Sequence, residues 1–224
     1  MLNVNNYEYF EEVKQTLFKY LDNSKDIDLV QSKKLNIALV EKNQYLEKNQ
    51  FDKIYALLPA YQSVLNFYTK RQDIQLSMWY DMAMIYFYND KFEDCLHFVS
   101  LILNHKALHT MIDLESYCLL LKMFVFIEIN QTHHFDNNIE NLRRKLYRDD
   151  KMFKAENAIL KMLVDYSVAN SATNKIQILE QHQQNIGTIL QDKLEQNINN
   201  YFPVQLWLNA KLEHKTIYQK FNQI

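Results

Sequence analysis

Residues 77–96 have the sequence SMWYDMAMIYFYNDKFEDCL, in which aromatic residues and methionine are unusually dense. Such a stretch is typical either of a ligand-binding surface or of the packed inside of a helix pair. Apolar side chains recur here at the i, i+3, i+4 and i+7 spacing of one helix face, and a polar turn separates them from a second helical pattern. The residues expected to pack the two helices together are Trp79, Met82, Ala83, Tyr86 and Cys95. The spacing therefore predicts a helical hairpin with a core, rather than a ligand-binding box.

The composition of the whole chain also favours helices. Its 224 residues include one glycine, Gly187, and two prolines, Pro59 and Pro203. β-Hairpins and phosphate-binding loops need residues that adopt positive φ, for which glycine is the usual choice. Hydrophobic residues make up 48% of the chain, which is ample for a core. An all-α fold follows.

Charge and apolar runs exclude several classes of partner. Lysine and arginine number 25 against 27 acidic residues, so no overall basic bias points to nucleic acid. The apolar run 117–129 is interrupted by Lys122 and Glu128 and is too short to cross a bilayer. The first fifteen residues lack a signal-peptide pattern, and the two cysteines lack metal-ligand spacing. We expect a cytoplasmic protein with no nucleic-acid partner, no membrane partner and no cofactor.

Helical periodicity extends nearly from end to end and defines ten expected helices. Their ranges are 5–21, 27–48, 51–69, 72–89, 92–105, 111–130, 133–149, 151–170, 173–200 and 203–222. Pro59 predicts a kink or a helix boundary near Leu58. Thr110 and Ser171 are expected N-caps, and Pro203 suits the first turn of the last helix. Gly187 is expected to mark a bend or a close approach of another helix.

Three stretches of the sequence resemble one another. Residues 43–58, 84–99 and 126–142 each end a helix on an apolar face, turn at an asparagine and restart with phenylalanine and an acidic residue. The turn residues are Asn49, Asn89 and Asn130, and the restarts begin at Phe51, Phe92 and Phe135. A single helix pair cannot bury its apolar stripe, whereas stacked pairs share a continuous core.

The hairpin at 77–105 resembles a tetratricopeptide repeat. Trp79, Met82, Ala83 and Tyr86 stand at the W-x2-L-G-x2-Y positions, and Cys95 is the small residue of the second helix. Val99 and Ala107 depart from the phenylalanine and proline of that pattern. With the stretches 141–163 and 206–215, the chain also resembles a large, mostly uncharacterised bacterial family of helical-repeat proteins.

The resemblance implies a right-handed α-α superhelix of about ten helices in one domain, 1–224. The repeat units would be 27–69, 72–105 and 111–149, with capping helices over 151–224. Such repeats line a concave groove with first-helix residues, here Ser77, Tyr80, Met84, Phe87, Tyr88, Leu121 and Val125. A groove of this composition suits an apolar peptide or helix. The alternative is that neighbouring helices, including the C-terminal ones, already cover these residues.

A second candidate set comprises Glu128, Arg143, Arg144 and Glu156. Arginine is scarce in this chain, so the set predicts either an anion site or an inter-helix ion pair, and ion pairing is the simpler interpretation. The histidines at 97, 105, 109, 133 and 134 lack a third ligand at a helical interval, so no metal site is expected.

No sequence signature of an enzyme is present, so we do not expect catalysis. The leading functional hypothesis is a non-catalytic scaffold that binds a protein or peptide in the concave face. The alternatives are a peptide-sensing regulator that switches an effector, and a structural assembly component whose groove is filled. The amphipathic segment 173–200 also makes a homodimer possible.

Overall fold

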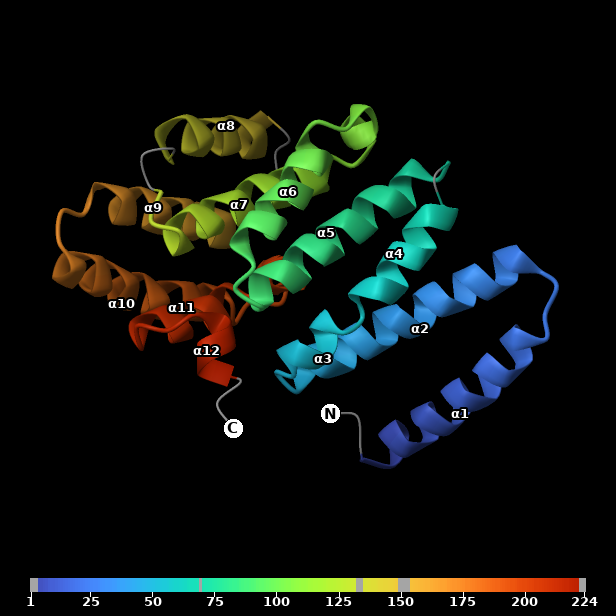
Figure 1. The fold of residues 1–224 in the computed structure, drawn as a ribbon. Helices are drawn as coiled ribbons and strands as arrows, with labels where there is room; N and C mark the ends of the chain where they lie inside the picture. The colour runs from blue at the N-terminus through green and yellow to red at the C-terminus, as the bar shows by residue number, and fades with distance from the viewer. Residues whose placement is uncertain (1–3, 69, 132–134, 149–153, 222–224) are drawn as a thin grey trace. The chain divides into compact units, whose positions relative to one another are not determined.

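The structure, a computed structural model, describes residues 4–68, 70–131, 135–148 and 154–221 (Figure 1). Throughout these ranges the regular elements are helices, with no strand, which confirms the all-α fold class. Backbone proximity divides the chain into two compact units, Met1–Lys70 and Arg71–Ile224, and each is described by itself. The expected repeat unit 27–69 lies in the first, and the other two lie in the second.

The first unit consists of α1 (Val4–Asp22), α2 (Ile27–Glu47), α3 (Phe51–Tyr55) and α4 (Leu58–Phe67). Helix α2 packs against both α3 and α4. The buried residues at these contacts are Ile37, Ala38, Phe51, Ile54, Leu58, Tyr61 and Val64. The expected helix 51–69 is divided at Pro59, which stands in the first turn of α4, so the predicted boundary near Leu58 is confirmed.

The second unit consists of α5 (Gln72–Tyr88), α6 (Phe92–Leu103), η1 (Lys106–Thr110), α7 (Ile112–Glu128), α8 (Phe135–Arg148), α9 (Lys154–Val168), α10 (Ala172–Ile189), η3 (Glu195–Asn200), α11 (Val204–Leu212) and α12 (Ile217–Phe221). From α5 to α12 each α-helix packs against the next along the chain (Figure 1). Sequence neighbours are therefore neighbours in space within this unit.

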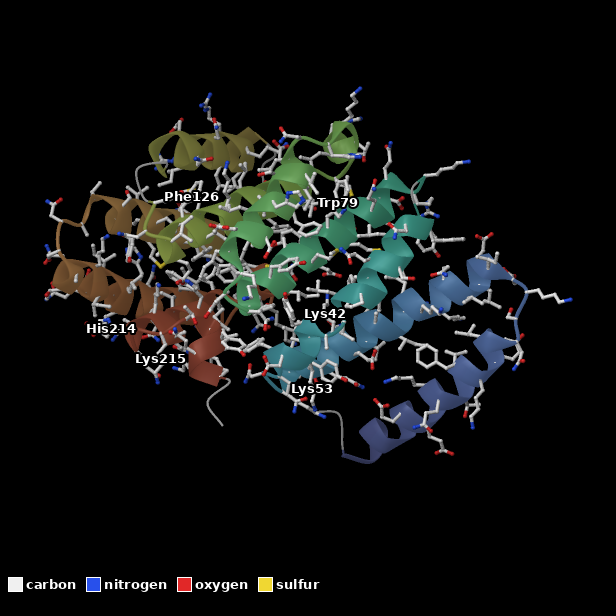
Figure 2. The ribbon with its side chains drawn as sticks, in the orientation of Figure 1. Lys42, Lys53, Trp79, Phe126, His214 and Lys215 are labelled. Carbon is white, nitrogen blue, oxygen red and sulfur yellow. The ribbon has the colours of Figure 1, made fainter. Side chains whose placement is uncertain are left out.

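The hairpin predicted at residues 77–105 is formed by α5 and α6. Met82, Ala83 and Cys95 are completely buried. The Tyr86 ring stacks on Phe98, with the ring centroids 5.6 Å apart. Trp79, labelled in Figure 2, meets the His105 ring edge-on at 5.6 Å. The small side chains at 83 and 95 let the two helices approach closely, while the aromatic rings seal the edges of their contact.

Four helices end in the same backbone turn, although none of these turns contains glycine. The second residue after each helix adopts positive φ in a left-handed conformation: Asn49, Asp90, Asn130 and His214. In each turn the next amide donates back to a carbonyl five residues earlier, as Gln131 N does to Phe126 O at 2.8 Å. Asparagine and aspartate tolerate this conformation better than most residues.

Two of these turns differ from the sequence-based expectation. The turn expected at Asn89 places positive φ on Asp90, and the side-chain Nδ2 of Asn89 donates to Ile85 O. The expected helix 203–222 is interrupted at His214, between α11 and α12 (Figure 2). Histidine adopts positive φ more readily than most residues, but a single histidine inside a helical pattern does not predict a turn.

The remaining local predictions were partly right. The Ser171 side chain accepts from Asn174 N, which confirms it as an N-cap. Thr110 does not cap α7, because its hydroxyl donates to Ala107 O within η1. The expected helix 173–200 ends at Ile189, and η3 follows. Gly187 does lie at a close approach, since a Cβ there would stand 3.0 Å from Gln205 Nε2 of α11.

The left-handed turn at Asn130 can be tested by two substitutions. Asn130→Gly should raise the free energy of unfolding by up to about 1 kcal/mol, because glycine adopts positive φ without a steric cost. Asn130→Ala should lower it by about 1 kcal/mol. Urea denaturation followed by circular dichroism measures both. Asn104, a helix C-cap with φ of −94°, is the matched control, where glycine should destabilise. The same sign for glycine at both positions would contradict the assignment.

Candidate functional site

The predicted groove residues lie almost entirely inside the protein. Ser77 is exposed, and its hydroxyl donates to Asp73 O on its own helix. The other six are buried, each with no more than 7% of its surface exposed: Tyr80, Met84, Phe87, Tyr88, Leu121 and Val125. Side chains so deeply buried present little surface to a peptide, so an open concave groove does not follow from these residues.

The chain's own residues 198–208, here called the covering segment, pack on this face of α5 and α7. The Phe202 ring stacks on Phe124 of α7 at 4.0 Å and meets Phe87 of α5 edge-on at 5.4 Å. Tyr80 donates its hydroxyl hydrogen to Tyr201 O at 3.0 Å. The covering segment therefore occupies part of the face on which the groove was predicted. This arrangement corresponds to the alternative in which C-terminal elements cover the groove.

Glu128, the last residue of α7, fastens the covering segment. Its side chain is only 3% exposed. Trp207 Nε1 donates to one carboxylate oxygen at 2.6 Å, and Lys211 Nζ donates to the other at 2.7 Å. A buried carboxylate needs such partners, because an unpaired buried charge is strongly destabilising. Both donors come from α11, so α11 is tied to the end of α7.

The candidate set of two glutamates and two arginines is therefore not a single cluster. Arg143 and Arg144 lie on α8 and form exposed pairs with Glu140 of the same helix, at 3.7 and 3.6 Å. The inter-helix ion pair of Glu128 is with Lys211, not with either arginine. Helical spacing identified Glu128 as a residue needing a partner, but the choice of partner depends on which helix packs over it.

The anion-site alternative also has little support in the surroundings of Arg144. Arg144 lines a hollow of about 410 Å³ with Glu115 and Lys145. Lys145 is buried and paired with Glu115, and the Arg144 guanidinium donates to the side-chain oxygen of Asn141. Both cationic groups are already engaged by the protein, so the hollow offers an anion no free pair of cations.

An open cavity of about 360 Å³ lies beside the covering segment, between α7, α8, α9 and η3. Its polar and aromatic lining comes from Asp113, Ser116 and Tyr117 of α7, Glu156 of α9, Glu195 and Asn197 of η3, and Tyr201. Leu146, Leu194 and Ile198 complete it. We call it the tyrosine pocket, because Tyr117 and Tyr201 stack in parallel with centroids 3.5 Å apart. Burial and the neighbouring Tyr201 raise the pKa of Tyr117.

Glu195 positions η3 against the start of α9. Its carboxylate accepts from Ala155 N at 2.9 Å and from Lys154 N at 3.3 Å. The first amides of a helix have no partner within the helix, and a carboxylate there also meets the partial positive charge of the helix end. Glu195 thus acts as the N-terminal cap of α9, which explains how a carboxylate can be 93% buried in this position.

Glu156 lies one residue beyond these capped amides. Its Oε2 atom is buried and has no hydrogen-bond partner within the described ranges. Burial raises the pKa of the Glu156 carboxyl above its usual value; a hydrogen bond from its own backbone amide opposes this, and the negative charge of Glu195 adds to it. Buried polar atoms are nearly always hydrogen-bonded in folded proteins. The tyrosine pocket therefore contains an acceptor that the described protein does not use.

The sequence did not predict the tyrosine pocket. Glu156 belongs to the set that predicts an anion site or an inter-helix ion pair. Tyr117 begins the apolar run 117–129, and neither Tyr201 nor Glu195 belongs to a predicted site. Their roles depend on η3 returning to the start of α9, and helical periodicity carries no information about such long-range contacts.

The histidines at and near η1 are engaged locally. His105 Nδ1 accepts from Ala107 N, and His109 Nδ1 contacts Lys106 O, so both are used locally within η1. His133 and His134 lie outside the described residues. Among the described residues, no group of three or more His, Cys, Asp or Glu side chains could hold a metal ion. None of the described helices has the length and apolarity needed to cross a membrane.

Comparisons with protein-family models, with curated proteins and with solved structures each found no match to this chain. The properties of the tyrosine pocket must therefore be argued from its own residues.

Phe202→Ala tests whether the covering segment is part of the core. The substitution should lower the free energy of unfolding by about 3 to 4 kcal/mol, because it empties a ring-sized space between Phe87 and Phe124. Urea denaturation of the full chain measures the loss. Val168→Ala is the control, since that side chain is 68% exposed and its truncation should change little. A loss below about 1 kcal/mol at position 202 would contradict the packing described above.

Glu156→Gln tests whether the carboxylate with the unpartnered Oε2 atom lowers the stability of the fold. A raised pKa means that the folded chain binds this proton more tightly than the unfolded chain, so wild-type stability falls as pH rises through that pKa. The neutral variant avoids this loss. It should gain up to about 1 kcal/mol at pH 7, given partial solvent screening, or about 2 to 4 °C in Tm. The gain should shrink as the pH is lowered to about 4.

Differential scanning calorimetry at pH 7 and pH 4 measures this difference. Glu93→Gln, at an exposed position in the first turn of α6, serves as the control and should show no gain. A lower Tm for Glu156→Gln at pH 7 would mean that the carboxylate has a stabilising partner in solution.

Proposed function

We propose that this chain is a non-catalytic interaction module that binds a protein or peptide at the tyrosine pocket, beside the covered face of α5 and α7. The observation that carries the proposal is the buried Glu156 Oε2, which lacks a partner among the described residues and lies at an open cavity. An unsatisfied carboxylate oxygen costs stability, whereas a donor supplied by a partner would remove that cost. The resemblance of residues 77–105 to a tetratricopeptide repeat supports a binding role.

The size of the pocket limits the mode of binding. A volume of about 360 Å³ is near the lower end of the range for small-molecule sites. It accommodates one or two side chains rather than a length of peptide. We therefore expect the partner to insert an anchor side chain, while the rest of its contact lies on the surrounding surface. Leu194, 69% exposed at the pocket, offers apolar surface for that wider contact.

A structural assembly component is the second candidate, and the covering segment is the observation that favours it. A face filled by Phe202 and Trp207 needs no partner, so the helices could serve only as a rigid spacer. A peptide-sensing regulator would use the same tyrosine pocket with a free peptide as its ligand. The two binding alternatives require the pocket, and the structural one does not.

Site-specific photo-crosslinking in cells tests the proposal. Benzoylphenylalanine replaces Leu194 at the pocket or Val168 at the end of α9, two apolar positions of nearly equal exposure, 69% and 68%. We expect a crosslinked protein from position 194, none from position 168, and loss of the crosslink when Glu156→Gln is added. Equal products from both positions, or a product that survives Glu156→Gln, would favour the structural alternative.

A further inference from the structure

We propose that the tyrosine pocket recognises an organic cation, the ammonium or guanidinium group of a lysine or arginine side chain on a partner peptide. This inference rests on the proposed function, because it names the ligand class of the same pocket. Three features of the lining support it: its charge, an unused acceptor and its aromatic wall.

The described lining is acidic. Asp113, Glu156 and Glu195 contribute carboxylates, and none of the described residues that line the cavity is lysine, arginine or histidine. Glu195 is engaged by the amides of α9, and Asp113 also has an interaction within the protein, so Glu156 is the carboxylate that offers an unused oxygen. A pocket with this charge favours a cation and disfavours an anion, since a like charge in a partly buried site is costly.

One buried acceptor among the lining residues is not used by the described protein, namely Glu156 Oε2. Ser116, which is 6% exposed, lines the same cavity. An ammonium group carries three hydrogen-bond donors and no acceptor, and a guanidinium carries five donors. Either group supplies the donor that Glu156 Oε2 lacks.

The aromatic wall and the apolar lining fit a cation on an alkyl stem. Tyr117 and Tyr201 both line the cavity, and the faces of tyrosine rings attract ammonium and guanidinium groups. Leu146, Leu194 and Ile198 offer apolar contact for the methylene groups behind the charge. A bare metal ion fits less well, because no group of three candidate ligands converges among the described residues. A cavity of about 360 Å³ also exceeds what a single ion fills.

Fluorine NMR of the full chain, labelled with 3-fluorotyrosine, tests the inference. Tyr117→Phe and Tyr201→Phe assign the two pocket signals. The probes are acetyl-Ala-Lys-Ala-amide, its arginine and norleucine counterparts, and free spermidine. The lysine or arginine peptide should shift both signals in a saturable way, while the uncharged norleucine peptide should not. Glu156→Gln should weaken the binding about tenfold, because a charge-assisted hydrogen bond is lost. Glu93→Gln should leave the binding unchanged.

The outcomes separate the ligand class from the proposed function. Equal binding of the lysine and norleucine peptides, or no binding of any cationic probe, overturns the inference. If no probe binds but the crosslink at position 194 still depends on Glu156, the interaction module stands and only its cationic ligand is rejected. If that crosslink is absent as well, both fail. Binding of spermidine without either basic peptide supports an organic cation and identifies its source as a free amine. Asp113→Asn, at an exposed position, provides a second variant that should also weaken the binding.

Discussion

The second unit of the chain depends on a buried carboxylate. Glu128 ends α7 with a side chain that is almost fully enclosed, and Trp207 and Lys211 of α11 donate to its two oxygens. Removing those donors would leave an uncompensated buried charge, at a cost of about 3 to 5 kcal/mol. The Trp207 ring also packs edge-on against Phe124 of α7. The polar and apolar contacts therefore act together, and α11 cannot leave α7 without losing both.

This attachment determines what the inner face of the helices can do. Because α11 is held at the end of α7, the residues before it are drawn across α5 and α7, and Phe202 fills the space between Phe87 and Phe124. The face that a tetratricopeptide-like array would offer to a peptide is thus partly core. The same stretch of chain carries Glu195 to the start of α9 and Tyr201 to Tyr117. The tyrosine pocket therefore forms beside the covering segment, because the same stretch of chain positions both η3 and Tyr201.

The sequence predicted the features that depend on local chemistry. Helical periodicity, Pro59 and Ser171 gave helix boundaries that the structure confirms, because turns, caps and helix faces are encoded within a few residues. The sequence failed where the outcome depended on distant residues. Periodicity identified the apolar face that includes Phe87 but not the residue that covers it, and it marked Glu128 without indicating Lys211. The tyrosine pocket brings together residues from four elements, so no local pattern contained it.

Glu156 is the residue on which the proposed binding role rests. A glutamate in the first turn of a helix is normally stabilised by the partial positive charge of the helix end. In α9 that end is already capped by Glu195. A hydrogen bond from its own backbone amide lowers the pKa of Glu156, but burial together with the second negative charge raises it more. The Glu156 charge is therefore less favourable here than at an ordinary helix start. Residues that reduce stability in this way are often found at binding sites, where the partner supplies the missing interaction. Glu156 thus fits the proposed binding role better than a purely structural one.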